Sequence, residues 1–489
     1  DRSGDAVMKC LTALALTLVL TTPCLAQETS VKDHPRVREA VNLLEVWVDA
    51  QRAYEEIPGI SMAVVHDQEL VWSSGFGYAH PERQIEATPQ TVYSICSISK
   101  LFTSIGVMQQ RDEGRLRLDD TAGEHLDWFN IEDTYPDASP VTIEGILTHS
   151  SGLPRESDYP YWTPPEFPFP THEQIVERLG DQAELYPAYT YFQYSNLGLT
   201  LAGEIVAAVS GESYDDYISR HILDPLGMED TYTAIPVSEH GRRMAVGYTA
   251  RTRDGTRHRV ELFEARGISP AAGFASTVED LATFASWQFR VLYHDADEVL
   301  ARNTLREMYR VHWVDPDWDT HWGLGFATWR TNDKTFVGHG GSCPGYLSSM
   351  NIQPDSKIAA TVMVNSSGVN TGRFTSQAQT IMAPAIKAAL DESSEAEPMD
   401  PELEIYLGTY SELPWTGEMA VVPWKGSIAL LFLPTTSPLD NLVKLKKVGE
   451  HTFRRVRDDG ELGEEVVFDV EDGKAVRMWR HSNFSPRMW

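Results

Sequence analysis

A serine and a lysine with the spacing of a nucleophile and its base begin an apolar stretch of the chain. Ser97 and Lys100 are three residues apart in Ser-Ile-Ser-Lys, so on a helix they would share one face within hydrogen-bonding reach. Burial would lower the pKa of Lys100, and the neutral amine could then accept the Ser97 proton as the hydroxyl attacks a carbonyl. The helix N-terminus would offer N–H groups to the developing oxyanion. Alone, the pair is a weak signal.

A second candidate group is the tripeptide that contains Tyr194 and Asn196 on either side of a serine. The phenol would relay protons between the nucleophile and the leaving group, and the amide would hold a substrate carbonyl. The structural alternative is a tyrosine and an asparagine that close a turn before a buried helix.

A third candidate is His339 with Gly340 and Gly341, which follow a strand-like run. Two glycines would let a substrate lie close against that strand. An ordinary glycine turn is the alternative. An oxyanion hole of the α/β-hydrolase kind would need a downstream Gly-x-Ser-x-Gly motif, and the sequence has none.

The net charge and the lack of metal-binding motifs argue against some classes of function. The chain has 71 acidic and 41 basic residues and a formal net charge of −30. This charge repels phosphate backbones and anionic lipids, so we expect no nucleic-acid partner. The acidity does not identify a substrate, because an acidic surface more often serves solubility. The sequence lacks Cys-x-x-Cys, His-Glu-x-x-His and acidic calcium loops, so we expect no metal and no cofactor.

The N-terminal residues have the pattern of a secretory leader. Met8 and Lys9 precede an apolar run that ends in small residues before Gln27, which predicts cleavage after Ala26. The run is too short for a stable membrane anchor. We therefore expect an exported protein, periplasmic or secreted, without a membrane anchor.

The elements that would position these groups alternate between strands and helices. Apolar spacing predicts a helix over residues 37–55, a hairpin over 60–72, a buried helix from 97 to Gly114, and a helix-rich middle. Strands are predicted at 335–338, 348–353 and 358–365, and a helix up to about residue 390. Proline-dense, aromatic residues 158–170 predict an irregular segment packed over other elements. Its aromatic residues 159–169 could wall an apolar acyl pocket or be buried over the helical region, and the sequence favours neither.

Composition divides the chain into four parts. Residues 1–26 form the leader and upstream residues, and 27–390 form the catalytic unit. Residues 391–402 are acidic and apolar-poor, which is typical of a linker. Residues 403–489 carry short alternating runs between turn residues and predict a small β domain.

Seven blocks in one order make the sequence resemble the serine β-lactamase and penicillin-binding-protein superfamily, most closely its class C-like esterases and D-aminopeptidase-type peptidases. The resemblance implies an α/β (α+β) fold, in which helices flank an antiparallel sheet and a helical subdomain lies beside it. The C-terminal part weakly resembles the lipocalin-like β modules of some peptidases in this superfamily. The blocks lie at residues 93–103, 114–120, 146–154, 193–198, 225–228, 272–277 and 338–342.

The resemblance also implies a role for each candidate residue. Ser97 would be the acylated nucleophile, Lys100 its base, Tyr194 the proton relay and Asn196 a substrate ligand. The backbone N–H groups of Ser97 and Ser342 would hold the oxyanion. His149 belongs to one of the blocks, and we expect it to pack rather than to catalyse.

The sequence departs from β-lactamases at His339, where those enzymes usually carry a lysine. A histidine is mostly neutral near pH 7 and offers no permanent charge to a substrate carboxylate. We therefore expect an exported serine hydrolase that acts on small esters or peptide-like amides. The alternatives are a β-lactamase or D-alanyl carboxypeptidase, and a non-catalytic peptidoglycan-binding or sensor protein. Homo-oligomerisation stays open.

The sequence raises the question whether two of the cysteines form a disulfide. Cys10 and Cys24 would leave with the leader, while Cys96 precedes Ser97 and Cys343 follows Ser342. If the resemblance holds, these two thiols lie near each other. Two small buried thiols are commoner than a disulfide, so the sequence leaves their pairing open.

Overall fold

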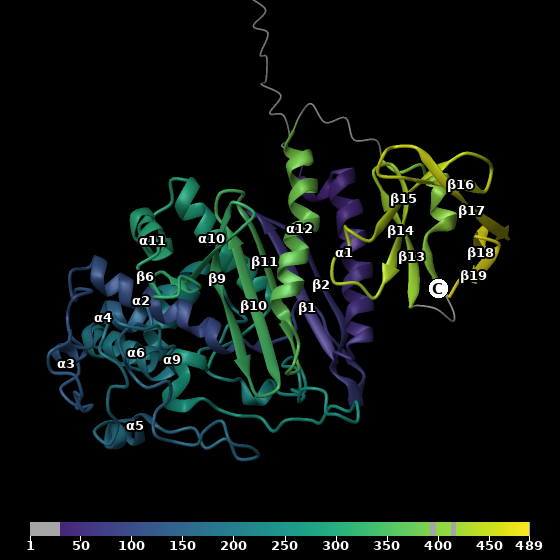
Figure 1. The fold of residues 1–489 in the computed structure, drawn as a ribbon. Helices are drawn as coiled ribbons and strands as arrows, with labels where there is room; N and C mark the ends of the chain where they lie inside the picture. The colour runs from purple at the N-terminus through teal and green to yellow at the C-terminus, as the bar shows by residue number, and fades with distance from the viewer. Residues whose placement is uncertain (1–29, 392–397, 412–416, 489) are drawn as a thin grey trace, which may run out of the picture.

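The computed structural model describes residues 30–391, 398–411 and 417–488. A central sheet lies between a helical region and a pair of long helices, and a separate barrel of strands follows at the C-terminal end (Figure 1). The predicted leader and half of the predicted linker, residues 392–397, fall outside the described residues.

The central sheet has nine antiparallel strands in the order β3-β2-β1-β11-β10-β9-β8-β7-β6. Two short strands, β4 (Tyr93–Ser94) and β5 (Ala275–Ser276), pair apart from it. The strands of the sheet are β1 (Gly59–His66), β2 (Glu69–His80), β3 (Ile85–Glu86), β6 (Trp313–Val314), β7 (His321–Trp322), β8 (Ala327–Thr331), β9 (Lys334–Cys343), β10 (Tyr346–Gln353) and β11 (Ile358–Val364).

Helices cover both faces of this sheet. Strand β1 alternates, with Ile60, Met62 and Val64 in one apolar cluster and Ala63 and Val65 in another. Side chains two apart point to the same face, so the two clusters lie on opposite faces of the sheet. The first face is covered by α1 (Pro35–Tyr54) and α12 (Thr371–Leu390), and the second by α10 (Val278–Tyr293).

The helical region beside the sheet is built around one buried helix, α2 (Ser99–Asp112), which is preceded by a 3₁₀ turn, η3 (Cys96–Ile98). Nearly all of α2 is buried because helices surround it. The other helices are α3 (Ala122–His125), α4 (Ile143–Leu147), α5 (His172–Leu179), α6 (Asn196–Ser210), α7 (Tyr214–Ile218), α8 (Asp224–Leu226), α9 (Ser269–Ala272) and α11 (Arg302–Tyr309).

The C-terminal strands form an eight-stranded antiparallel sheet in chain order, β12 to β19. Tyr410 of the first strand forms a bridge with Arg487, the residue directly after the last strand, so the sheet is a nearly closed barrel. Its interior is filled by apolar side chains that include Tyr406, Phe453 and Phe468. The strands are β12 (Gly408–Ser411), β13 (Glu418–Trp424), β14 (Ser427–Leu433), β15 (Leu442–Lys447), β16 (Thr452–Val456), β17 (Leu462–Glu471), β18 (Lys474–Arg480) and β19 (Asn483–Pro486).

The outer face of the barrel packs against α1. Val422 and Leu431 of the barrel belong to the same apolar cluster as α1 and α12. At its edge the Glu39 carboxylate accepts from the backbone N–H groups of Lys425 and Gly426, both at 2.8 Å. The barrel and the catalytic unit therefore share part of one core.

The predicted fold class is confirmed, and one element is longer than predicted. The sequence predicted a strand at 335–338, whereas β9 runs on through Gly340 and Gly341 to Cys343. These glycines pair with Ser349 and Ser348 of β10 rather than forming a turn. Residues 158–170 contain no helix or strand, as predicted, and among the described residues no helix is long and apolar enough to cross a membrane.

Candidate active site

Ser97 lies in the turn η3 that leads into α2. The residue before it, Cys96, has a φ of 52°, in the left-handed region that residues other than glycine rarely adopt. Such a conformation persists only where the surroundings fix it. Here the Ser99 hydroxyl donates to the Cys96 carbonyl at 2.5 Å, and the Ile95 carbonyl accepts from Ser348 Oγ at 2.9 Å.

Lys100, one turn later, reaches back to Ser97. Its Nζ lies 3.2 Å from Ser97 Oγ, 2.8 Å from Asn196 Oδ1 and 2.7 Å from the Ala271 carbonyl oxygen. The side chain is 1% exposed. Burial holds the pKa of Lys100 well below its usual value, against the opposing effect of the Glu156 carboxylate. The neutral amine expected from the sequence is therefore favoured.

Tyr194 and Asn196 come from the segment that enters α6. Ser195 caps the helix by accepting from the Gly198 N–H at 2.8 Å, and this places Asn196 in the first turn. The Tyr194 ring centroid lies 4.8 Å from Lys100 Nζ. Burial raises the pKa of Tyr194 and a hydrogen bond with Ser97 partly offsets this, so the phenol is protonated at neutral pH. The tripeptide thus both closes the turn and brings its polar groups to Ser97.

His149 packs against the segment that carries Tyr194. It is buried, its ring lies 4.3 Å from that of Tyr194, and its Nδ1 accepts from the Ser195 N–H at 3.1 Å. Burial holds its pKa well below the usual value. Its contacts are those of a packing residue.

His339 on β9 faces the same group of side chains. Burial, and secondarily Lys100, lowers the pKa of His339 to about 3, so the ring is neutral. Nδ1 lies 2.6 Å from the Gly340 carbonyl oxygen, which can only accept, so Nδ1 carries the proton. Nε2 is then left as an acceptor, and it is buried without a partner. The ring therefore offers a lone pair and no positive charge.

The two glycines of β9 differ in the space around them. A Cβ on Gly341 would lie 2.1 Å from the Ile95 carbonyl oxygen, so only glycine lets the strand pass this close to the turn that holds Ser97. A Cβ on Gly340 would meet nothing closer than the Ser348 carbonyl oxygen at 3.7 Å. Gly340 is exposed and Gly341 is buried.

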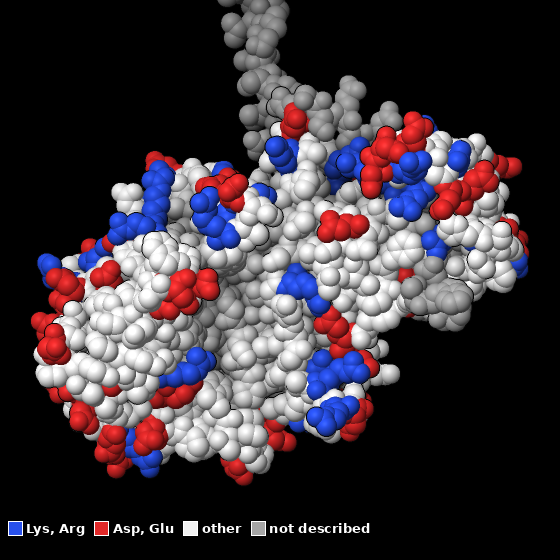
Figure 2. Space-filling model, in the orientation of Figure 1, with Lys and Arg blue, Asp and Glu red and all other residues white. Residues whose placement is uncertain are grey.

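All the residues predicted from the sequence except Lys100 line one open cleft of about 750 Å³. Lys100 lies beneath its floor. On the face shown in Figure 2, acidic and basic side chains are scattered rather than gathered in one patch. The predicted residues in the cleft wall are Ser97, Tyr194, Asn196, His339, Gly340, Gly341 and Ser342.

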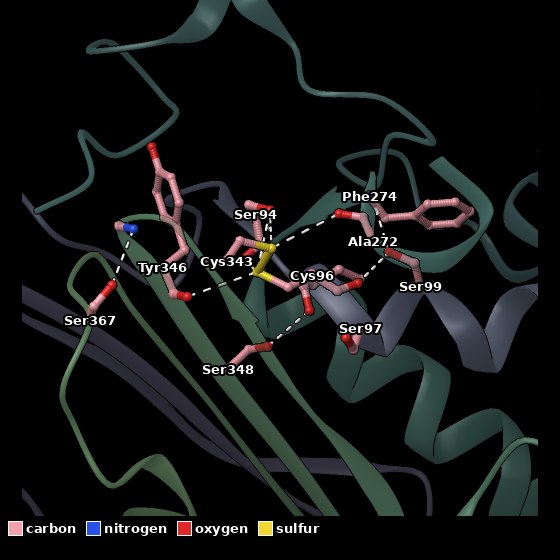
Figure 3. The surroundings of a disulfide bond; sticks show 12 residues. Ser94, Cys96, Ser97, Ser99, Ala272, Phe274, Cys343, Tyr346, Ser348 and Ser367 are labelled. Carbon is pink, nitrogen blue, oxygen red and sulfur yellow. Dashed lines mark hydrogen bonds between the residues drawn. A yellow bond between two sulfur atoms is a disulfide. The ribbon is translucent and has the colours of Figure 1, made fainter. Parts of the chain in front are cut away.

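A disulfide joins the turn η3 to the end of β9 beside the cleft. Cys96 and Cys343 are bonded, with their Cα atoms 5.7 Å apart (Figure 3). The commoner arrangement of two free thiols is therefore not the one present. The bond ties the residue before Ser97 to the residue after Ser342, and both cysteines are buried.

The sequence did not single out Arg155 and Glu156, which line the cleft wall, or the Ala271 carbonyl, which binds Lys100. Arg155 and Glu156 come from the irregular segment after residue 154, where no periodic pattern marks a functional side chain. Trp162, from the aromatic segment that was expected either to wall a pocket or to pack, also lines the cleft. The side chains of Tyr161 and Phe169 are buried behind Trp162, so the aromatic segment both packs and lines the cleft.

Within the described residues, no cluster of histidine, cysteine and acidic side chains could hold a metal ion.

Comparison with known proteins shows what this chain is similar to. The family model described as Beta-lactamase matches residues 45–380. "Beta-lactamase-like protein 2" of Dictyostelium discoideum is 25% identical over 393 residues, which cover 79% of this chain and 70% of that protein. "Penicillin-binding protein 4" of Amycolatopsis lactamdurans is 26% identical over 376 residues, 74% of this chain and 95% of that protein.

A solved structure matches nearly the whole chain, barrel included. The octameric penicillin-binding protein homologue from Pyrococcus abyssi has a TM-score of 0.61 and 26% identity, and the match covers 91% of this chain and 99% of that one.

Proposed function

Because the chain belongs to the beta-lactamase family, we propose that it is a serine hydrolase that forms an acyl-enzyme on Ser97 and cleaves small esters or peptide-like amides. The observation that carries the proposal is the contact between Ser97 Oγ and the buried Lys100 amine, whose pKa is held well below its usual value. A neutral amine at 3.2 Å from a hydroxyl is placed to act as its general base.

In the acylation step, Ser97 Oγ forms a bond to the substrate carbonyl carbon while its proton moves to Lys100. The carbonyl π electrons move onto oxygen, and the backbone N–H groups of Ser97 and Ser342 stabilise that oxyanion. When the carbonyl re-forms, the bond to the leaving group breaks. The leaving group takes a proton that Lys100 supplies through the Tyr194 hydroxyl, which returns Lys100 to its neutral form.

In the deacylation step, water replaces the leaving group. Its oxygen bonds to the acyl carbon while one of its protons passes to the Lys100–Tyr194 pair. The ester bond to Ser97 Oγ then breaks, and that proton returns to the serine. The acid is released and the free hydroxyl is restored, so no outside reactant other than water is needed.

The charge of the cleft favours a substrate without a carboxylate at the His339 position. The ring of His339 is neutral and largely buried, so it offers no positive charge to a substrate carboxylate. A penicillin or a C-terminal D-alanine would bring a carboxylate there. This argues for an ester or an internal amide over the β-lactamase or carboxypeptidase alternative.

The test is rapid-quench intact mass spectrometry of the protein mixed with p-nitrophenyl acetate, a penicillin and a D-alanyl amide, followed by peptide mapping. We expect an acetyl or D-alanyl adduct on Ser97 that is absent from Ser97→Ala. An adduct from penicillin alone would favour the alternative hydrolase. Absence of both adduct and substrate consumption would favour the non-catalytic binding protein, and an adduct on another residue would contradict the mechanism.

We also propose that the chain self-associates, because the similar protein from Pyrococcus abyssi is octameric and the match covers both parts of this chain. Light scattering after size exclusion should give a mass that is a multiple of 54.8 kDa for the full chain. A monomer at micromolar concentration would contradict this.

A further inference from the structure

Glu156 is a carboxylate at the edge of the cleft whose bonds point inward. Both of its oxygens lie 2.9 Å from Asn196 Nδ2, and the hydroxyl of the buried Tyr161 donates to it. The Arg155 guanidinium lies 3.2 Å away on the solvent side. The mechanism above gives Glu156 no role.

These bonds fix which way the Asn196 amide faces. An ionised carboxylate only accepts, so the group that faces Glu156 must be the NH₂ of the amide. The carbonyl Oδ1 is therefore turned toward Lys100, 2.8 Å from Nζ. With the amide reversed, its oxygen would oppose a carboxylate and its NH₂ would face Lys100.

The orientation of the amide decides where the lone pair of Lys100 points. A neutral amine has two N–H bonds and one lone pair, and Nζ has three neighbours. Two of these, Asn196 Oδ1 and the Ala271 carbonyl oxygen, only accept, so they take the two N–H bonds. The lone pair is left for the third neighbour, Ser97 Oγ. A reversed amide would instead donate to the lone pair and turn an N–H bond toward the serine.

We propose that Glu156 is a positioning residue that, by holding the Asn196 amide, directs the Lys100 lone pair at Ser97. The proposal rests on the proposed role of Lys100 as base. Glu156 acts through Asn196 and Lys100 and not on the substrate.

The charge of Glu156 gives a second and separable effect on Lys100. The groups around Lys100 from other elements are Tyr194, His149, His339, Arg155 and Glu156. The phenol is protonated and both imidazoles are neutral, so only Arg155 and Glu156 carry charge. Glu156 raises the pKa of Lys100 and Arg155 lowers it, with Glu156 the stronger.

The first experiment compares Glu156→Ala, which removes the acceptor that holds the Asn196 amide, with Glu166→Ala, a matched control on an exposed glutamate of the same irregular segment. With p-nitrophenyl acetate as substrate, Glu156→Ala should lower kcat by about 10- to 100-fold, since a small loss of alignment costs this much, and change KM by less than about 3-fold. Glu166→Ala should match wild type. An unchanged kcat in Glu156→Ala, or a change in KM alone, would overturn the proposal.

The second experiment separates a positioning role from a merely structural one. If Glu156 acts through the amide, Glu156→Ala should add no further loss of kcat to Asn196→Ala in a double-mutant cycle. Additive losses would show that Glu156 acts by another route and would overturn the proposal.

The third experiment does not need turnover. In protein labelled with ¹³C at the lysine ε-carbons, the resonance missing from Lys100→Met reports the titration of Lys100. Removing the Glu156 charge should move this titration to lower pH in Glu156→Gln and leave it unmoved in Glu166→Gln. An unmoved titration in Glu156→Gln would contradict the charge effect of Glu156 on Lys100, whereas the positioning role is decided by the first two experiments. Wild type that shows the Lys100 titration but hydrolyses none of the substrates would sink the proposed function and leave the coupling of Glu156 to Lys100 standing.

Discussion

The cleft at Ser97 and the interior of the C-terminal barrel differ in what they bury. The cleft buries Lys100, His149, Asn196 and His339, and leaves the His339 Nε2 atom without a partner. The barrel interior is largely apolar, and the hydroxyl of Tyr410, one of its few polar groups, donates to the Tyr406 carbonyl. Buried polar groups cost free energy unless they are satisfied. The cleft therefore concentrates buried ionisable and amide groups that the barrel interior lacks, and these are the groups to which the proposed chemistry is assigned.

Removal of the proposed nucleophile should have the largest effect on activity. Ser97→Ala should lower turnover of p-nitrophenyl acetate by about 10⁴-fold or more, because no other group supplies the attacking oxygen. Thermal unfolding should stay close to wild type, since the serine side chain faces the cleft. Activity within 10-fold of wild type would mean that the cleft is not where the reaction occurs.

Removal of the base comes next. Lys100→Met keeps the volume of the buried side chain and should lower kcat by about 10²- to 10⁴-fold, as expected for loss of a general base. Circular dichroism serves as the control for folding.

The pH profile of wild type tests the same group without mutation. Lys100 works only when neutral, so kcat/KM should rise as pH increases through its pKa and then level off. Burial lowers that pKa, so the rise should be complete well below pH 10.5. A rise centred near pH 10.5 would show that Lys100 is not the base or is not buried.

The disulfide at the edge of the cleft should have a smaller effect. Cys343→Ser releases the tie between the residues beside Ser97 and Ser342, and we expect kcat to fall on the order of 10-fold with little change in KM. An unreduced digest of wild type should yield the Cys96 and Cys343 peptides as a linked pair. Recovery of the two peptides separately would remove the basis of this prediction.

A substitution in the barrel should leave the chemistry nearly unchanged and affect stability. Phe453 is fully buried among Tyr406 and Phe468, so Phe453→Ala should cost about 3–5 kcal/mol in the free energy of unfolding of the barrel. Below its unfolding transition, kcat should stay within about 2-fold of wild type. A large loss of kcat in folded protein would mean that the barrel interior contributes to the cleft.

The sequence predicted the parts of the site whose geometry is local. The spacing of Ser97 and Lys100 is set by one helical turn, and the strands are marked by the alternation of apolar residues. Both features could therefore be predicted from the sequence. Their convergence with Tyr194, Asn196 and His339 came from the family resemblance, because residues this far apart meet only in the folded chain.

The rest could not be predicted, and Glu156 and Ala271 show why. Glu156 is one of 71 acidic residues in a segment without a period, and its role depends on the direction of a single amide. Ala271 contributes through its backbone carbonyl, which carries no signature in the side chain. The pairing of Cys96 with Cys343 likewise depends on how closely β9 approaches the turn of Ser97.

The unequal space around Gly340 and Gly341 limits how this protein can diverge in evolution. A side chain at 341 would push the strand away from the turn that holds Ser97, so that position is closed to variation in any descendant that keeps this geometry. Position 340 is exposed in the cleft wall and has room for a Cβ, so the shape of the cleft can change there by a single mutation. Two adjacent glycines therefore have opposite evolutionary prospects, the first open to substitution and the second fixed by the close approach of two backbone segments.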